Sequence, residues 1–592
     1  MRDYDIVIID SGINQNIYND VPGICVSKSE EGFYYSKDID DEVGHGTIIY
    51  SVIQKQAPST KIFMIKLDER PEAFDSSILI EALQYVKMNI RCKWINMSLG
   101  VKICDQISKL YSICSDLTKM GSVIVSAFDN EGCYSYPAAF DCIIGVDTKN
   151  DLKSATEYDY IQDSPINIFA KGSVQRQSLK DGKTLLVGGS SISCAHIVAK
   201  LANGMTEKVS LSNALEYLKK NARQIYLSQH TEDNSINKIF EIQKAIVFPF
   251  AKEAHAFVRY SDMISFQIQG YYDIRRSGKV GKTLSSYYEG FSSDETIKDI
   301  DRANFEGIDT IILGHLDELN SISQRDYRDE LIQIAIEKHL NIYSFDSLNQ
   351  YAEKLYSSGI QFFSPHINSN NVPSNTFGKL YKISKPVVGI FGTSSQQGKF
   401  SLQLALKRGL EAKDYNVGTI GTEPHSLLFD FDVVFPMGYH STVNLQNQEV
   451  VTYLNNAINH LCTLDKEIIL TSSQAQTIPY YCNHLLEFPS LQYHFALGIN
   501  PDAIMLCINY FDEIEYIKNT VNMLQGLTNS SILSLVMNPM TYTNEWSTVK
   551  RKISSEEFSG KAESLWNELS IPVYLLGEES VSELCQNIID FF

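Results

Sequence analysis

Three short runs in the first third of the chain supply a carboxylate, an imidazole and a hydroxyl, in that order. They contain Asp10, His45 and Ser191, each within two residues of a glycine. A serine hydroxyl is a poor nucleophile until an imidazole accepts its proton, and the imidazole needs a carboxylate to hold its tautomer and stabilise its cation. Together the three residues predict an activated serine nucleophile, the chemistry of a serine peptidase.

Each residue lies in a local sequence that suits this chemistry. Asp10 follows the apolar run 6–9, which predicts a buried strand, and Ser191 precedes the apolar helical stretch 192–201. Strand carboxyl ends and helix N-termini are where open α/β sheets hold their sites. Taken singly, each run is equally typical of a turn or a helix cap. The prediction therefore depends on their conjunction.

A fourth run adds a hydrogen-bond donor. The apolar stretch 123–127 predicts another buried strand, and it leads into Asp129 and Asn130. An asparagine side chain can donate to the oxyanion of a tetrahedral intermediate, a contribution of a few kcal/mol. We therefore expect Asn130 to stabilise an oxyanion.

Residues 1 to about 205 resemble a subtilisin-family (subtilase) peptidase domain. Beyond the four residues above, the run 95–100 resembles the family strand that lines the primary specificity pocket. The runs 136–139 and 143–146 resemble the segment after the oxyanion asparagine. The resemblance implies that Asp10 orients the imidazole, His45 is the general base, Ser191 attacks, Asn130 binds the oxyanion, and Ser98, Leu99 and Gly100 form the pocket wall.

Three positions depart from the family pattern. Ser190 replaces the threonine before the nucleophile, Ala195 replaces a proline, and Asp129 replaces the glycine before the asparagine. None removes a catalytic atom, but a negative charge at Asp129 is expected to weaken oxyanion binding. The alternative is a catalytically silent domain that only binds peptide.

Composition narrows the class of protein. A chain of 592 residues exceeds one core and predicts two to four domains. Its net charge of −20 argues against nucleic-acid or anionic-membrane partners and is compatible with a basic peptide.

Eleven scattered cysteines without a CxxC pair indicate reduced thiols and no metal site. With no span of about 20 apolar residues and no secretion signal or pro-segment expected, we predict a cytoplasmic protein.

Two polar runs, 228–237 and 364–374, are typical of linkers. They predict an α/β chain of three domains. These are a subtilisin-like parallel-sheet domain over 1–240, a small Rossmann-like domain over 241–375 and a P-loop NTPase-like domain over 376–592.

The middle domain is predicted from alternating strand and helix patterns. Its expected strands are 245–250, 264–272, 310–313 and 341–345, and its expected helices are 251–263 and 330–339. Residues 272–274 and 314–317 would end strands, where such sheets bind ligands, although they could equally be caps. The run 278–283 ends like a phosphate loop, but Arg276 stands where a glycine is needed, which indicates a basic surface loop.

The last domain opens with an apolar strand at 386–391, a glycine-containing loop, Lys399 and a helix over 400–412. This order predicts a phosphate cradle. The loop resembles that of the dethiobiotin-synthetase and MinD branch of P-loop proteins, with Phe400 in place of the usual magnesium-binding hydroxyl and Ser401 about 100° further round the helix. We expect ATP or GTP, with Mg²⁺, to bind rather than to be hydrolysed. The expected nucleotide-binding residues are Gly392, Thr393, Gln397, Gly398, Lys399, Phe400 and Ser401.

Further buried strands are expected at 467–470, 503–508, 532–537 and 573–576. The loops 421–425 and 435–439 could bind a ligand or be plain turns. The whole arrangement is similar to components of peptide-maturation systems. This similarity implies a leader peptidase acting on a ribosomally made, modified precursor peptide, with no cofactor needed for the cleavage. A nucleotide-dependent enzyme in the C-terminal module is a further alternative.

Overall fold

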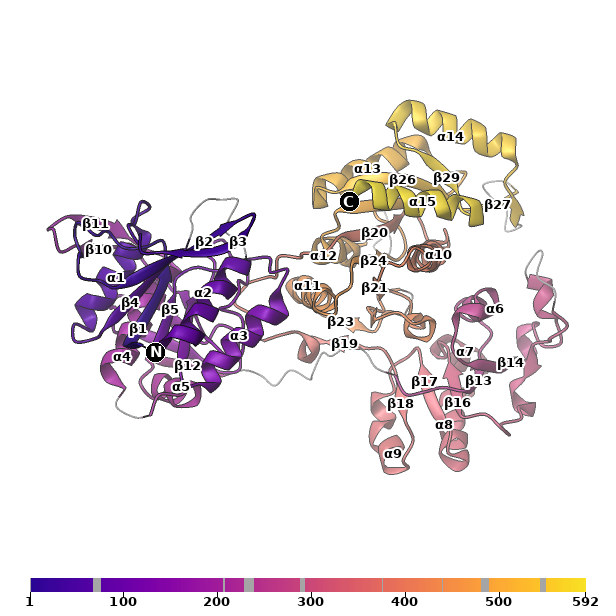
Figure 1. The fold of residues 1–592 in the computed structure, drawn as a ribbon. Helices are drawn as coiled ribbons and strands as arrows, with labels where there is room; N and C mark the ends of the chain where they lie inside the picture. The colour runs from indigo at the N-terminus through magenta and orange to yellow at the C-terminus, as the bar shows by residue number, and fades with distance from the viewer. Residues whose placement is uncertain are drawn as a thin grey trace. The chain divides into compact units, whose positions relative to one another are not determined.

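The computed structural model describes residues 2–67, 76–205, 208–227, 239–287, 293–374, 376–438, 440–480, 489–543 and 550–592. The chain divides into two compact units (Figure 1). Unit 1 comprises Met1–Thr231 and Pro373–Ser384, and unit 2 comprises Glu232–Val372 and Lys385–Phe592. The expected linker at 228–237 lies outside the described residues. Residues 376–384, which we expected to open the last domain, group with unit 1 instead.

Unit 1 is built on a ten-stranded sheet in the order β12-β8-β9-β7-β6-β5-β1-β4-β2-β3. Every neighbouring pair is parallel except β2–β3 and β8–β9. The strands are β1 (Arg2–Asp10), β2 (Gly23–Ser29), β3 (Gly32–Ser36), β4 (Ile62–Leu67), β5 (Ile90–Met97), β6 (Val123–Ala127), β7 (Ile144–Thr148), β8 (Tyr158–Ile161), β9 (Ile168–Ala170) and β12 (Gln224–Tyr226). A separate antiparallel hairpin joins β10 (Gln175–Ser178) and β11 (Thr184–Val187).

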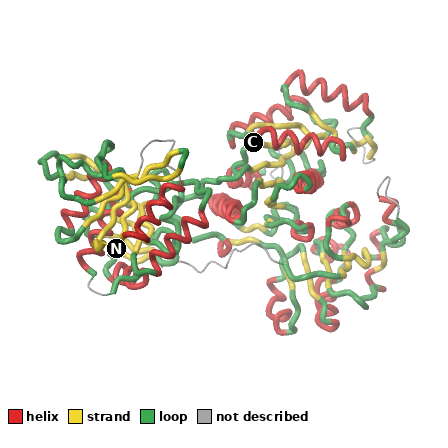
Figure 2. Tube along the Cα trace, viewed as in Figure 1, coloured by secondary structure: helices red, strands yellow, loops and turns green. Residues whose placement is uncertain are grey.

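Helices cover both faces of this sheet, as Figure 2 shows. In β1, Ile6 and Ile8 belong to one apolar core, and Val7 and Ile9 belong to the other. A strand buried on both faces needs this continuous apolar run. The first core is covered by α1 (His45–Gln56), α4 (Ser190–Gly204) and α5 (Leu211–Lys220), and the second by α2 (Ser76–Asn89) and α3 (Ile107–Lys119).

Unit 2 contains two parallel sheets. The first has the order β15-β14-β13-β16-β17-β18. Its elements are β13 (Lys244–Phe248), α6 (Ala254–Arg259), β14 (Gln267–Asp273), β15 (Lys298–Asp299), β16 (Thr310–Leu313), α7 (Asp317–Ser323), α8 (Tyr327–Lys338), β17 (Asn341–Ser344), α9 (Ala352–Ser357) and β18 (Phe362–Phe363). The helix expected over 251–263 is the shorter α6 followed by a 3-10 turn at Ser261–Met263, because the backbone leaves the helical region at Tyr260.

The second sheet has the order β22-β21-β24-β20-β25-β26-β29 and is parallel throughout. Its strands are β20 (Val387–Gly392), β21 (Val417–Gly421), β22 (Val433–Val434), β24 (Ile468–Ser472), β25 (Ala503–Ile508), β26 (Ser531–Met537) and β29 (Val573–Leu575). Its helices are α10 (Lys399–Glu411), α11 (Asn447–Thr463), α12 (Ser490–Ile499), α13 (Ile514–Thr528), α14 (Ser555–Leu569) and α15 (Glu578–Phe591).

Two small strand pairs complete unit 2: β19 (Ile367–Asn368) with β23 (Val443–Asn444), and β27 (Met540–Tyr542) with β28 (Lys550–Lys552). The run 364–374, expected to be a linker, therefore contains a paired strand. An apolar core that includes Phe257, Phe345, Leu404 and Phe429 is shared by the two large sheets. The predicted α/β class, with several parallel sheets, is confirmed.

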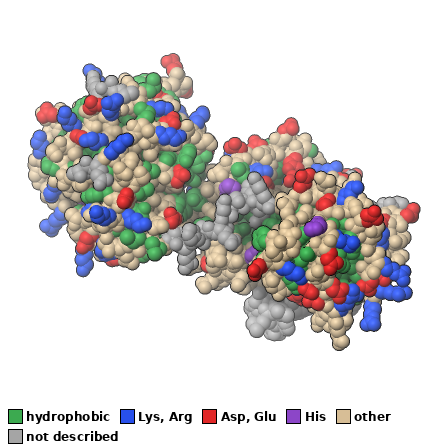
Figure 3. Space-filling model, turned by 90° about the horizontal axis from the view of Figure 1, so that it is seen from below, with side chains coloured by type: hydrophobic (Ala, Val, Ile, Leu, Met, Phe, Trp, Pro, Cys, Tyr) green, Lys and Arg blue, Asp and Glu red, His purple; other side chains and the backbone are tan. Residues whose placement is uncertain are grey.

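The described residues also show how surface charges are distributed and whether the cysteines are paired. Acidic and basic side chains are interspersed on the face shown in Figure 3. The described cysteines are all free thiols. Within the described ranges, no helix combines the length and the apolar character needed to cross a bilayer.

Candidate active site

The sheet of unit 1 brings the predicted site residues to one edge. Asp10 ends β1, Ser98 follows β5 and Asn130 lies three residues after β6. These three strands are neighbours and run parallel, so their carboxyl ends meet at the same edge. His45 begins α1 and Ser191 lies in the first turn of α4.

Asp10 and His45 form a hydrogen-bonded pair, with Nδ1 of the ring 2.7 Å from Oδ1 of the carboxylate. The backbone N–H of Ser11 donates to the same oxygen at 2.8 Å, and Asp10 is 1% exposed. Burial alone would lower the pKa of His45, but the hydrogen bond and the charge of Asp10, together with the charge of Asp41, outweigh it and raise that pKa. The pair fixes the proton on Nδ1, which leaves Nε2 as a base.

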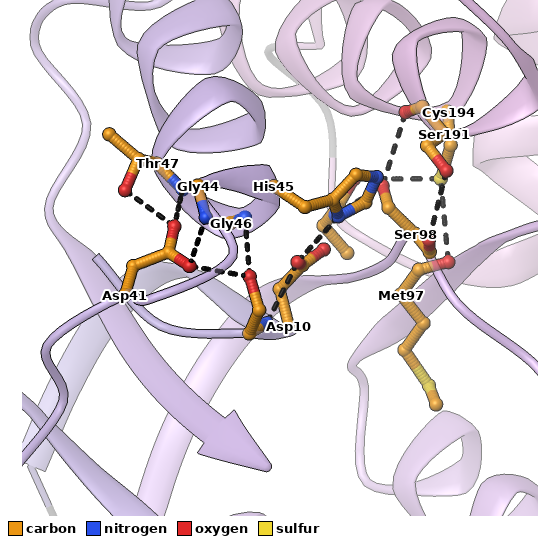
Figure 4. A network of polar contacts seen from close by, with 12 residues as sticks. Asp10, Asp41, Gly44, His45, Gly46, Thr47, Met97, Ser98, Ser191 and Cys194 are labelled. Carbon is orange, nitrogen blue, oxygen red and sulfur yellow. Dashed lines mark hydrogen bonds and ion pairs between the residues drawn. The ribbon is translucent and has the colours of Figure 1, made fainter. Parts of the chain in front are cut away.

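Asp41, which the sequence analysis did not single out, holds the loop before His45. Its Oδ1 accepts from the Ser11 hydroxyl at 2.9 Å and from the Gly44 N–H at 2.7 Å, and its Oδ2 accepts from the Thr47 N–H at 2.8 Å. Figure 4 shows this carboxylate beside Gly44 and Thr47, to the left of the imidazole. The signal that could have revealed it is an Asp just before a glycine turn, where its side chain satisfies the turn's N–H groups.

The glycine beside the imidazole is required by close packing. A Cβ at Gly46 would lie 2.2 Å from the carbonyl oxygen of Gly12 and 3.2 Å from Cβ of Asp10. The loop can therefore approach β1 closely enough for the Asp10–His45 bond only with glycine at this position.

Ser191 is tied to Ser98 by two hydrogen bonds. Its hydroxyl donates to the Ser98 carbonyl at 3.0 Å, and the Ser98 hydroxyl donates to the Ser191 carbonyl at 3.1 Å. In Figure 4 the His45 ring lies between the Asp10 carboxylate and Ser191. Among the described residues the ring bonds only to Asp10. The structure thus joins carboxylate to imidazole and does not join imidazole to hydroxyl by a hydrogen bond.

In this state the Ser191 hydroxyl is directed to the Ser98 carbonyl. Catalytic hydrogen bonds are often long or misdirected without substrate and form only in the complex. A relay from Ser191 to His45 would require the hydroxyl to leave the Ser98 carbonyl.

The expected pocket-wall residues differ in their surroundings. Ser98 is 4% exposed and bonds to Ser191, whereas Leu99 packs partly against the core beside α2 and α3. A Cβ at Gly100 would lie 2.8 Å from the Tyr136 carbonyl, so the chain runs close to the segment after Asn130 there.

Asn130 lies against the start of α4. Its Oδ1 accepts from the Ser190 N–H at 3.0 Å, and among the described residues its exposed Nδ2 has no partner and can donate. The carboxylate of Asp129, expected to weaken oxyanion binding, lies 3.4 Å from the Lys102 ammonium, which also bonds to Glu131. One cation is therefore shared by two carboxylates beside Asn130.

In unit 2, the loop between β20 and α10 has the strand, loop and helix order of a phosphate cradle. Nζ of Lys399 donates to the carbonyls of Ser394 at 2.7 Å and Ala475 at 3.1 Å, and burial lowers its pKa to about 8. The Ser394 N–H donates to Oε1 of Gln397 at 2.9 Å, so the loop is bonded to one of its own side chains.

The remaining residues of this loop bear on whether it suits a phosphate group or a magnesium ion. Thr393 bonds to the buried Asp512, and Gly398 adopts a φ of 86° as the helix N-cap. A Cβ at Gly392 would lie 2.7 Å from Gln397 Oε1. Phe400 packs on His425, with ring centres 4.9 Å apart. Lys399 supplies the cation that a phosphate would need, whereas the aromatic Phe400 cannot be a magnesium ligand, and Ser401 is only half-buried.

A second polar cluster lies where β16 and β17 end. Nδ1 of His315 is 2.6 Å from Oδ1 of Asp346, and Arg328 bonds to both Asp346 and Asp317. Burial would raise the pKa of Asp346, but hydrogen bonds from His315 and a backbone N–H hold it below its ordinary value. A cavity of about 510 Å³, lined in part by Asp317, Arg328, Asp346 and His440, opens beside them. Only the segment 314–317 was indicated by the sequence.

No protein-family model matches the sequence, and no curated protein matches it. Solved structures do match the fold in part. A DUF1611 family protein from Anabaena variabilis is matched over 59% of this chain and 100% of its own, at 10% identity and a TM-score of 0.43. A cold-adapted subtilisin-like serine proteinase is matched over 37% of this chain and 84% of its own, at 19% identity and a TM-score of 0.30. The epidermin leader peptide processing serine protease of Staphylococcus aureus is matched over 36% of this chain and 68% of its own, at 17% identity and a TM-score of 0.29.

Proposed function

We propose that unit 1 is a serine endopeptidase that cleaves the leader from a ribosomally made, modified precursor peptide in the cytoplasm. The observation that carries the proposal is the Asp10–His45 pair at the sheet edge where Ser191 lies in the first turn of a helix. A carboxylate held at 2.7 Å from an imidazole, with a helix N-terminal serine and an asparagine amide nearby, is a set of groups suited to acyl transfer.

Each group has one task in the proposed cleavage. On substrate binding the Ser191 hydroxyl leaves the Ser98 carbonyl and donates to Nε2 of His45, and its oxygen then attacks the scissile carbonyl. Nδ2 of Asn130 donates to the oxyanion. Protonated His45, stabilised by ionised Asp10, passes the proton to the leaving amine. Water then attacks the acyl carbonyl as it loses a proton to His45. The bond from the acyl carbon to Ser191 Oγ breaks, and His45 returns the proton to that oxygen, which restores the hydroxyl.

The charge of the chain favours a basic substrate segment. The net charge is −20, and the exposed carboxylates Asp38 and Glu42 lie within seven residues of His45. Such carboxylates attract cationic peptides and raise their association rate at low salt. A leader cleaved at one site by such an enzyme would carry Lys or Arg near the cut.

Covalent labelling tests the proposal directly. A fluorophosphonate probe is expected to modify Ser191 in the full-length protein, because the activated hydroxyl attacks phosphorus as it would a carbonyl. The adduct is located by peptide mass spectrometry. Ser191→Ala should abolish it, while the control Ser190→Ala keeps a nucleophile at 191. An unlabelled native protein that still binds peptide tightly would identify unit 1 as a binding scaffold.

A second candidate function, nucleotide binding by unit 2, is favoured by the position of Lys399 at the start of α10 with its ammonium over the loop. Lys399→Ala is expected to weaken ATP or GTP binding by about tenfold or more, which is 1.4 kcal/mol or more. Binding should persist in EDTA because Phe400 offers no magnesium ligand. Calorimetry on Lys399→Ala and on the exposed control Lys413→Ala measures this, and equal affinities would remove the nucleotide proposal.

A further inference from the structure

We infer that residues 376–381, here called the strap, position the oxyanion loop of the peptidase, defined as residues 128–134. Lys379 is the positioning residue at its centre. The strap is separated from this loop by more than 200 residues of sequence, yet it belongs to unit 1. The inference rests on the proposed peptidase function and adds to it a residue outside the subtilisin-like sequence.

Lys379 holds the start of the oxyanion loop. Its side chain is buried, with the residue 6% exposed, and its ammonium donates to the Asp129 carbonyl at 3.2 Å. The same ammonium lies 3.0 Å from Oδ2 of Asp147 and 5.5 Å from the centre of the Phe128 ring. It therefore links the residue before Asn130 to the carboxyl end of β7.

The next two residues of the strap hold the other end of the loop. The Leu380 carbonyl accepts from the Tyr134 N–H at 3.0 Å, and Leu380 forms a parallel bridge with Cys133. The Tyr381 ring lies 4.5 Å from the Tyr134 ring. Consecutive strap residues thus bind both ends of the loop from which Asn130 projects.

The beginning of the strap is anchored away from this loop. The Phe377 ring lies 4.8 Å from Phe169 and 5.7 Å from Tyr226, which belong to β9 and β12. With Phe377 packed on the sheet and Leu380 bonded to the loop, Lys379 is fixed between two attachment points. A buried ammonium held in this way keeps one geometry.

The contacts of the strap hold Asn130 in position. An oxyanion donor acts only within hydrogen-bond distance of where negative charge develops, and a misplacement of about 1 Å can lower a rate by about 100-fold. The Lys379 charge also adds a positive group to a loop that carries Asp129. Loss of Lys379 should therefore reduce turnover and leave substrate binding nearly unchanged.

The test uses full-length Lys379→Met, Tyr381→Ala and, as a matched control, Lys382→Met, whose lysine is exposed in the same segment. We expect Lys379→Met to lower kcat and the rate of fluorophosphonate labelling by about 10- to 100-fold, with KM changed less than about twofold. Tyr381→Ala should lower both in the same sense, and Lys382→Met should change neither. Thermal unfolding midpoints confirm that each variant is folded at the assay temperature.

Hydrogen exchange separates failure of this inference from failure of the peptidase proposal. Lys379→Met is expected to speed exchange of the amides of residues 129–134 and to leave β1 unchanged, whether or not the protein cleaves peptides. If wild-type protein is not labelled at Ser191, the peptidase proposal fails and the exchange result alone decides the strap. Unchanged exchange in Lys379→Met, or unchanged labelling in a protein that is labelled, overturns the inference.

Discussion

His45→Ala is expected to lower kcat for peptide cleavage by about 10⁶-fold, and addition of Ser191→Ala in the same chain should lower it little further. The imidazole and the hydroxyl act as one unit, so removing either already removes the attack, and the losses do not add. Steady-state or single-turnover kinetics on the two single variants and the double variant measure this. About 10³- to 10⁴-fold catalysis over water should remain, from oxyanion stabilisation and binding.

The control for this experiment is a histidine outside unit 1. His339→Asn alters an exposed residue in unit 2 whose φ of 56° asparagine tolerates, and it should leave kcat unchanged. Losses that multiplied in the double variant would mean that His45 and Ser191 act independently. That outcome is incompatible with proton transfer between them.

Much of the unit 1 site could be predicted from the sequence, because each of its residues lies in a short run with a recognisable local pattern. The apolar run before Asp10 predicted a buried strand, and β1 ends at that residue. Adjacent parallel strands bring their ends together, which is why Asp10 and Asn130 lie at one edge although 120 positions separate them. Local pattern and sheet topology together were enough to expect this convergence.

Other parts of the site depend on pairings that leave no periodic signal. The hydrogen bond from Ser191 to the Ser98 carbonyl depends on which side-chain rotamer Ser191 adopts, and the types of the two residues do not determine that rotamer. The strap has a short sequence without helical or strand periodicity. Its assignment to unit 1 follows from contacts in space, such as those of Lys379 and Leu380 with the oxyanion loop and of Phe377 with the sheet. For the same reason residues 376–384 were expected in the last domain, whereas their contacts place them with the first.

The expected effect of Asp129 on oxyanion binding stays a prediction, and the surroundings of its charge could not be derived from the sequence. A carboxylate beside the oxyanion asparagine would raise the local negative potential if it were alone. Lys102 lies 3.4 Å from it, and the Lys379 ammonium bonds to its carbonyl. Neither lysine is near Asp129 in sequence, so these contacts become visible only in three dimensions.

Asp10→Asn is expected to lower kcat by about 10⁴-fold while leaving the fold intact, because an amide can hold the ring in the wrong tautomer and cannot stabilise the imidazolium. Cleavage requires neutral His45, whose pKa is raised above 6.5 by Asp10 and Asp41 against the effect of burial. In wild-type protein kcat/KM should therefore rise with pH through that raised pKa and reach a plateau above it. In Asp10→Asn the effect of burial on the pKa of His45 predominates and lowers that pKa. The rise of kcat/KM with pH should therefore occur at lower pH, and its plateau value should be lower than in the wild-type protein.

The same raised pKa fixes the sign of the stability effect. Folding favours protonated His45, so the Asp10–His45 pair contributes its full stability below the unfolded-state pKa of about 6.5 and loses it as pH rises through the raised folded-state value. Denaturant unfolding should accordingly show a larger difference between wild-type and Asp10→Asn proteins at pH 6 than at pH 9. The matched variant Asp5→Asn, an exposed pair with Lys93, should show no such decline over this interval, because its carboxylate is ionised at both pH values. If the loss of unfolding free energy in Asp10→Asn grew with pH, the folded protein would favour neutral His45. The imidazolium formed during cleavage would then have to be stabilised by groups other than Asp10.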